Sequence, residues 1–258
     1  MTLSRRMLAG LVAAAAIVSG LPDRPLRAEI PEKFSNLQVL PKNISKEALV
    51  REMRGFASAL GVGCIYCHKG EDPGLEDVDF ASDARETKKT ARLMLRMVHA
   101  INTDYVGRVD HPGRPDATPV GCFTCHHGLR RPQTMERVIG GALEEGGPEG
   151  AAAKYRELRG KYYGRAAYDF GQGPLNTLAE ARLEARDYKA AEALLALNLE
   201  FNPDAAWTHY LMGEAWLGLG QRDKARAEYE KAAALEPTNP MAPNRLKEMG
   251  APPASPRP

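Results

Sequence analysis

The chain has 258 residues, of which 43% are hydrophobic and 26% are charged, enough for one large domain or two small ones. Its formal net charge is only +2, and the basic residues are scattered along the sequence rather than gathered into a stripe. The composition therefore gives no indication of nucleic-acid binding.

Residues 1–28 are typical of an export signal. Arg5 and Arg6 form a short positive region, and the apolar run 7–20 that follows is too short to span a bilayer comfortably. Two prolines then end any helix, and we expect cleavage near Ala28. We expect the protein in the periplasm. The alternative is an uncleaved signal that tethers it to the inner membrane.

Residues 45–60 have the pattern of an amphipathic helix. Ser45 is a favourable N-cap. Four apolar side chains recur behind it at helical spacing: Leu49, Met53, Phe56 and Leu60. Gly61 and Gly63 are expected to end this helix and to turn the chain into the motif that follows.

The four cysteines form two C-x-x-C-H motifs, the spacing of c-type haem attachment. The first motif consists of Cys64, Cys67 and His68, and the second of Cys122, Cys125 and His126. In each, the two thiols can form thioethers to the vinyl groups of one haem, and the histidine can bind the iron as its proximal ligand. A thioredoxin-like pair would need a βαβ context, and a zinc site or two disulfides would not require a histidine after each pair. We therefore expect two covalently bound c-type haems.

Residues 83–101 predict a second helix ahead of the second motif. Its apolar stripe consists of Thr87, Ala91, Met94, Leu95, Val98 and Ile101. A loop rich in proline and glycine then leads to the second motif.

The iron of an electron-transfer haem usually takes a second protein ligand, most often Met or His. On the first helix Met53 is the only candidate, and its alternative role is that of a core side chain. On the second helix Met94, Met97 and His99 are all candidates, and spacing alone does not choose among them.

Residues 37–128 resemble the multihaem cytochrome c subunit of bacterial photosynthetic reaction centres. The matching features are the methionine-bearing helix before Cys-Ile-Tyr-Cys-His and the runs 80–83, 91–98 and 101–102. The resemblance is to the first two haem segments of that four-haem subunit, in which a helix supplies the axial methionine. It implies Met53 as the axial ligand of the first haem and Met94 as that of the second.

This sequence departs from the family pattern in several places. Two haem segments and the N-terminal lipid-anchoring cysteine of many members are missing, and an extra loop lies at about 111–118. His127 follows the second motif, where an arginine is more familiar. These differences leave haem binding intact but put docking to a photosynthetic reaction centre in doubt.

The last third of the chain contains a repeat with the tetratricopeptide period of thirty-four residues. Residues 178–182 align with 212–216 at this offset, as do Ala191 with Ala225 and Pro203 with Pro237. The second copy fits the repeat well, whereas the first carries Arg182 at the usual aromatic position. The pair is either a stabilising helical cap or a docking surface for a partner.

We therefore expect an all-α protein. Glycine clusters at 140–141 and 146–148 are expected to interrupt the helical stretch between the haem region and the repeats. The expected parts are an export signal at 1–28, a di-haem cytochrome domain at 29–135, a helical linker at 136–174, repeats at 175–250 and a disordered tail at 251–258.

The expected function is the transfer of single electrons between redox proteins or to a membrane-bound electron-transfer complex, without enzymatic activity. One alternative is a scaffold, assembly or sensor protein in which the repeats carry the function and the haems are structural. Another is a di-haem peroxidase. That enzyme requires an iron without a distal ligand, whereas both segments offer a methionine.

Overall fold

The computed structural model describes residues 31, 33–71, 77–109 and 118–250. The expected export signal and tail fall outside these ranges, as does the 111–118 loop except for its last residue. The described residues form helices and connecting turns, with a single isolated bridge between Lys69 and Asp79 and no strand among them. The predicted all-α class is confirmed. No described helix has the length and apolar content needed to cross a membrane.

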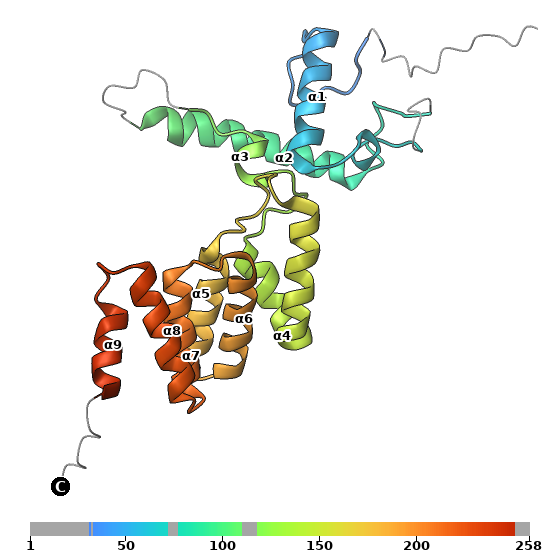
Figure 1. The fold of residues 1–258 in the computed structure, drawn as a ribbon. Helices are drawn as coiled ribbons and strands as arrows, with labels where there is room; N and C mark the ends of the chain where they lie inside the picture. The colour runs from blue at the N-terminus through green and yellow to red at the C-terminus, as the bar shows by residue number, and fades with distance from the viewer. Residues whose placement is uncertain (1–30, 32, 72–76, 110–117, 251–258) are drawn as a thin grey trace, which may run out of the picture.

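The N-terminal half consists of short elements around the two cysteine motifs (Figure 1). In chain order they are α1 (Lys46–Leu60), the 3-10 turn η1 (Cys64–Tyr66), α2 (Glu86–Ala100), the π turn η2 (Ile101–Tyr105), the 3-10 turn η3 (Val106–Arg108) and α3 (Cys122–His126). As predicted, Ser45 caps α1: its hydroxyl accepts from the backbone N–H of Ala48 at 3.2 Å. The left-handed Gly61 ends the helix.

The C-terminal half is a row of antiparallel helices, which Figure 1 shows side by side below the cysteine motifs. They are α4 (Met135–Tyr162), α5 (Gln172–Glu184), α6 (Tyr188–Phe201), α7 (Ala206–Gly218), α8 (Arg222–Leu235) and α9 (Met241–Gly250). The second helical hairpin repeats the first at the predicted offset, because its helices begin at 206 and 222 where those of the first begin at 172 and 188.

The long helix α4 packs against the repeats. The predicted break at Gly140 and Gly141 is wrong, because the helix passes through both residues and buries Ile139 and Leu143 against the repeat core. The predicted break at 146–148 is confirmed, since Gly147 has a φ of 63° and kinks the helix. Glu144 of α4 forms an ion pair with Arg182, so this charged residue has a partner at the position where the repeat usually carries an aromatic ring.

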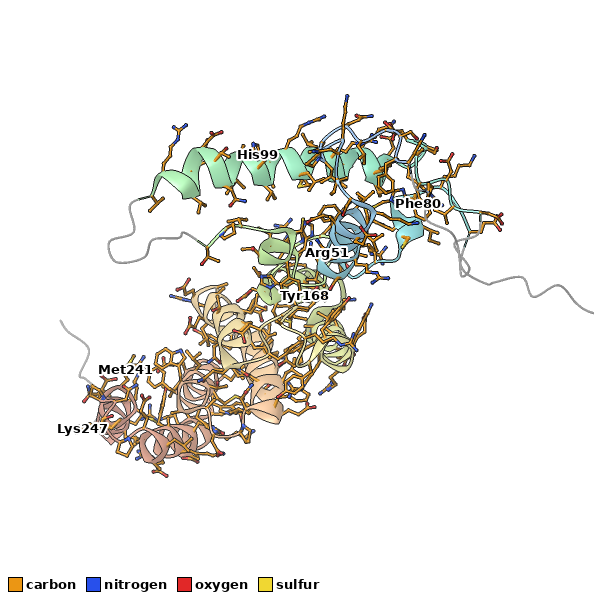
Figure 2. All side chains as sticks on the ribbon, turned by 90° about the horizontal axis from the view of Figure 1, so that it is seen from above. Arg51, Phe80, His99, Tyr168, Met241 and Lys247 are labelled. Atoms are coloured by element: carbon orange, nitrogen blue, oxygen red, sulfur yellow. The ribbon has the colours of Figure 1, made fainter. Side chains whose placement is uncertain are left out.

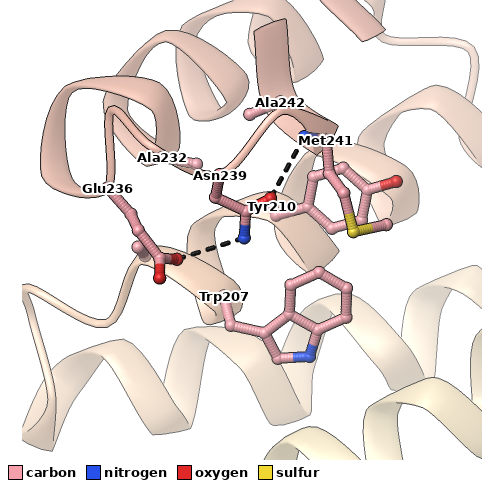
Figure 3. Close-up of a pocket in the computed structure, with 8 residues that line it drawn as sticks. Trp207, Tyr210, Ala232, Glu236, Asn239, Met241 and Ala242 are labelled. Atoms are coloured by element: carbon pink, nitrogen blue, oxygen red, sulfur yellow. Dashed lines mark hydrogen bonds between the residues drawn. The ribbon is translucent and has the colours of Figure 1, made fainter. Parts of the chain in front are cut away.

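Helix α9 covers the open end of the second repeat. The rings of Trp207 and Tyr210 stack 4.8 Å apart beside its first turn, where the Asn239 side chain accepts from the Met241 N–H at 3.1 Å (Figure 3). Further along the helix, the Arg245 guanidinium donates two hydrogen bonds of 2.7 Å to the Glu214 carboxylate of α7. A terminal helix of this kind shields apolar surface that a further repeat would otherwise cover.

Most of the buried apolar side chains lie in α4–α9. Among the described residues before 131, the buried hydrophobic side chains are only Leu49, Ala59 and Leu129. Helix α2 buries none, although it is amphipathic. The two halves are therefore built on different principles: the repeat half has an ordinary apolar core, and the cysteine-motif half does not.

Close packing within the second repeat depends on Gly213. A Cβ atom at this position would overlap the ring of Tyr229, a fully buried side chain. We predict that Gly213→Ala lowers the free energy of unfolding by about 1–3 kcal/mol, despite the higher helix propensity of alanine. Thermal unfolding followed by far-UV circular dichroism measures the change.

The matched control is Gly160→Ala on the exposed face of α4, where no atom lies within 4 Å of the added Cβ. Here alanine should raise stability by about 0.5–1 kcal/mol, because it reduces the freedom of the unfolded chain. Equal effects of the two substitutions would contradict the packing account.

Candidate haem sites

Two hydrogen bonds hold the histidine of the first motif in place. The chain turns at η1, and the His68 N–H donates to the Cys64 carbonyl at 3.0 Å. The imidazole Nδ1–H donates to the Phe80 carbonyl at 3.1 Å, and the two rings meet edge to face with centroids 5.1 Å apart. Because Nδ1 carries the proton in this bond, the neutral imidazole keeps Nε2 as a free lone pair, the state that binds a metal.

The second motif forms one short helix and reaches the same arrangement together with the turn that follows it. Cys122 and Cys125 lie on α3 three positions apart and so share a helix face. The His126 Nδ1–H donates to the Leu129 carbonyl at 2.8 Å, which again leaves Nε2 free. His127 ends the helix in the left-handed conformation, with a φ of 47°. Its buried Nδ1 has no hydrogen-bond partner among the described residues.

None of the four cysteines forms a disulfide. Burial raises the pKa of the Cys67 thiol and of the Cys122 thiol, which keeps both neutral and less open to oxidation. Burial also lowers the pKa of His68, and the nearby Lys88 ammonium adds to this shift. A neutral imidazole is the form that a metal requires.

The two motifs belong to one packed unit. Helix α1 contacts α3, and the Gly128 N–H after the second motif donates to the Ala59 carbonyl of α1 at 2.9 Å. The guanidinium of Arg130 lies over the ring of Tyr66 in the first motif, 5.7 Å from its centroid. The start of α2 is fixed to the first motif, where the Thr87 hydroxyl donates to the Tyr66 carbonyl.

The candidate axial residues lie on α1 and α2. Met53 is half-buried on α1, whereas Met94 and Met97 on α2 are 37% and 44% exposed. His99 is exposed and lies along α2 away from Phe80, which is beside the start of that helix (Figure 2). None of these positions distinguishes Met94 from Met97, so the axial assignments stay predictions.

The residues present fit two c-type haems. Each motif joins two cysteines outside any disulfide to a histidine whose Nε2 is available, and methionines lie on both neighbouring helices. Large apolar side chains also stand at the surface of α2, η2 and α3, as they would beside a porphyrin: Leu93, Met94, Met97, Tyr105 and Phe123.

Comparison with known sequences settles the family. The sequence model of the photosynthetic reaction centre cytochrome C subunit matches residues 14–159, more than half of the chain. The chain belongs to this family. A tetratricopeptide repeat model matches residues 206–239, which are α7, α8 and the turn that follows. The family relationship and the repeat expected from the sequence are both confirmed, and membership implies covalently bound haem.

Individual proteins that are similar in sequence to this chain show the same family relationship. The reaction center cytochrome c subunit of Thermochromatium tepidum is 28% identical over 185 residues, which is 70% of this chain and 40% of that protein. Cytochrome c-554 of Chloroflexus aurantiacus is 36% identical over 92 residues, or 36% of this chain and 20% of that protein. This chain therefore spans less than half the length of these curated relatives.

The repeats are similar to solved tetratricopeptide domains. The first such domain of Spaghetti (RPAP3), bound to an HSP90 peptide, is 20% identical, with 45% of this chain and 87% of that one covered and a TM-score of 0.32. The second domain of human RPAP3, in complex with an HSP70 peptide, is 22% identical over 46% and 93%, with a TM-score of 0.33.

The end of α1 lies close to the residues that follow the second motif, and a substitution at this contact tests whether the two motifs form one packed unit. Gly61 has a φ of 64°, and a Cβ atom there would overlap the Gly128 carbonyl oxygen. We predict that Gly61→Ala lowers the free energy of unfolding of the haem-loaded protein by roughly 1–3 kcal/mol, since the left-handed conformation alone costs about 1–2 kcal/mol. Guanidinium unfolding followed by haem absorbance measures this.

Gly63→Ala is the control, because Gly63 has a φ of −88° and open space around the added Cβ. Its effect should stay within about 0.5 kcal/mol. If the two variants were equally stable, the close approach of Gly61 to Gly128 would not matter for the unit.

Proposed function

We propose that this protein is an exported di-haem cytochrome that transfers single electrons between redox partners. The observation that carries the proposal is the repeated site: two cysteines that form no disulfide, followed by a histidine whose Nδ1–H is bound to a backbone carbonyl. The bound haems would supply reversible one-electron chemistry. The protein's own residues hold the haems, orient the proximal imidazoles and keep the two sites within one packed unit.

The proposed thioether ligands are Cys64 and Cys67 for the first haem and Cys122 and Cys125 for the second. The proposed axial pairs are His68 with Met53 and His126 with Met94. Met53 is assigned because it is the only candidate on α1 and because the family resemblance points to it. The choice of Met94 rests on the family resemblance alone.

Six-coordinate iron favours electron transfer over catalysis. A methionine at each distal position would leave no open coordination site, which a peroxidase requires. A scaffold or sensor role for the repeats is the second candidate. The second repeat supports it, because the matched residues 206–239 belong to a repeat class that offers a binding surface.

We propose the periplasm as the location, with the partners being redox proteins or a membrane-bound electron-transfer complex. The support is the signal-like sequence of residues 1–28 and the family itself, whose members include reaction-centre subunits. Protein docking through the repeats would place such a partner beside the haem unit.

A redox titration tests the proposal. Haem absorbance of the purified holoprotein should report two reversible one-electron steps per chain. Carbon monoxide should not change the reduced spectrum and the protein should not turn over peroxide, because both irons would already carry two axial ligands. Stoichiometric carbon monoxide binding together with peroxide turnover would contradict the carrier function and favour the peroxidase.

The axial methionines can be assigned one haem at a time. The variant Cys64→Ala/Cys67→Ala should keep only the second haem, and Cys122→Ala/Cys125→Ala only the first. Oxidised haem with a thioether ligand has a weak far-red absorption band. Met53→Ala should abolish this band in the first-haem protein and leave it whole in the second-haem protein. Met94→Ala should do the reverse.

Met97→Ala is the matched control on the same helix and should leave the band unchanged in both single-haem proteins. Loss of the band with Met97→Ala rather than Met94→Ala would shift the assignment along α2. Loss of the second-haem band with Met53→Ala would mean that α1 supplies the ligand across its contact with α3.

A further inference from the structure

Lys88 is a largely buried cation beside the first motif. Its side chain is 11% exposed, whereas that of its neighbour Lys89 is 52% exposed. A buried ammonium is costly unless its N–H groups are bonded. Lys88 Nζ lies 2.9, 3.0 and 2.8 Å from three consecutive carbonyl oxygens, those of residues 80, 81 and 82. Each of the three N–H groups of the ammonium therefore has a carbonyl oxygen as its acceptor.

The loop that provides these carbonyls is itself held in place. The Asp79 carboxylate accepts from the N–H groups of Ala81 and Ser82 at 3.0 and 2.9 Å. At the other end, Asp83 accepts from Asn36 at 2.8 Å and pairs with Lys88 at 3.3 Å. The Arg92 guanidinium, 2.8 Å away, holds the pKa of Asp83 well below its usual range, so the carboxylate stays charged.

One oxygen joins this cluster to the first haem site. The Phe80 carbonyl accepts both from Lys88 Nζ and from His68 Nδ1–H, at 2.9 and 3.1 Å. The corresponding carbonyl of the second motif, that of Leu129, accepts from His126. Among the hydrogen bonds of the described residues, it accepts none from a lysine or arginine. The two proximal histidines thus differ in the charge behind their carbonyl.

We propose that Lys88 is a positioning residue for His68 that raises the reduction potential of the first haem. Two effects act in the same direction. A positive charge near the iron favours the reduced state, which carries one positive charge less. A carbonyl that already accepts from an ammonium also binds the imidazole N–H less strongly, so His68 donates less electron density to the iron. The negative charge of the Asp83 carboxylate acts in the opposite direction and lowers the reduction potential.

This inference rests on the proposed function, because it concerns the potential of a bound haem. The alternative is that Lys88 only fastens the 79–83 loop to α2. A purely structural role predicts that substitutions of Lys88 and of Asp83 loosen the site in the same way. An electrostatic role predicts that they move the potential in opposite directions.

The test is a redox titration of the full-length holoprotein with three substitutions. Lys88→Met keeps the length of the side chain and removes the charge. It should lower the equilibrium constant for reduction of one haem at least tenfold, about 59 mV for a one-electron couple, and leave the other within twofold. Asp83→Asn should raise the same constant at least threefold. Lys89→Met, one position along the same helix, should leave both haems within twofold.

The proposal is overturned if Lys88→Met leaves both couples unchanged, if Lys89→Met has the same effect, or if Asp83→Asn shifts the couple downward as Lys88→Met does. If the Lys88→Met protein does not keep its first haem, the direction of the Asp83→Asn shift decides. A wild-type protein without two haem couples would refute the proposed function instead, so the two failures are distinguishable.

Discussion

The hydrogen bond from the histidine of each C-x-x-C-H motif to a backbone carbonyl is the constraint on which the N-terminal half of this protein depends. It fixes the proton on Nδ1 and leaves Nε2 with a free lone pair in both motifs. The two bonds are built differently. The Leu129 carbonyl comes from the turn directly after its own motif, whereas the Phe80 carbonyl comes from a separate loop that Lys88 holds in place. The first site therefore depends on α2 as well as on its own motif.

The two halves of the chain reach stability by different routes. Helices α4–α9 bury a continuous apolar core, and α9 covers its last exposed end. The haem half buries little apolar surface of its own and is joined instead by backbone contacts such as that between Gly128 and Ala59. Haem attachment would supply the apolar mass that such a unit lacks. The packing of α4 against the repeats connects the family segment, which ends at residue 159, to this second core.

Local features were predictable from the sequence because they depend on local chemistry. Ser45 and Gly61 lie at the two ends of α1 as expected, and the thirty-four-residue offset gave the positions of the helical hairpins. The unbroken helix at Gly140 and Gly141 was not predictable, since burial of the neighbouring Ile139 outweighs the weak helix propensity of glycine. The burial of Lys88 was not predictable either, because a lysine in a helical pattern is usually a solvated residue. Its three carbonyl partners come together only when the 79–83 loop folds back onto α2.

The central claim is that both C-x-x-C-H motifs carry a covalently bound haem. The most direct measurement is the mass of the intact denatured protein, purified after export from a host that attaches c-type haem. The account predicts the mass of one chain and two haems, and of one chain and one haem when both cysteines of either motif are replaced by alanine. A chain without added haem mass, with all four cysteines titrating as thiols, would contradict it.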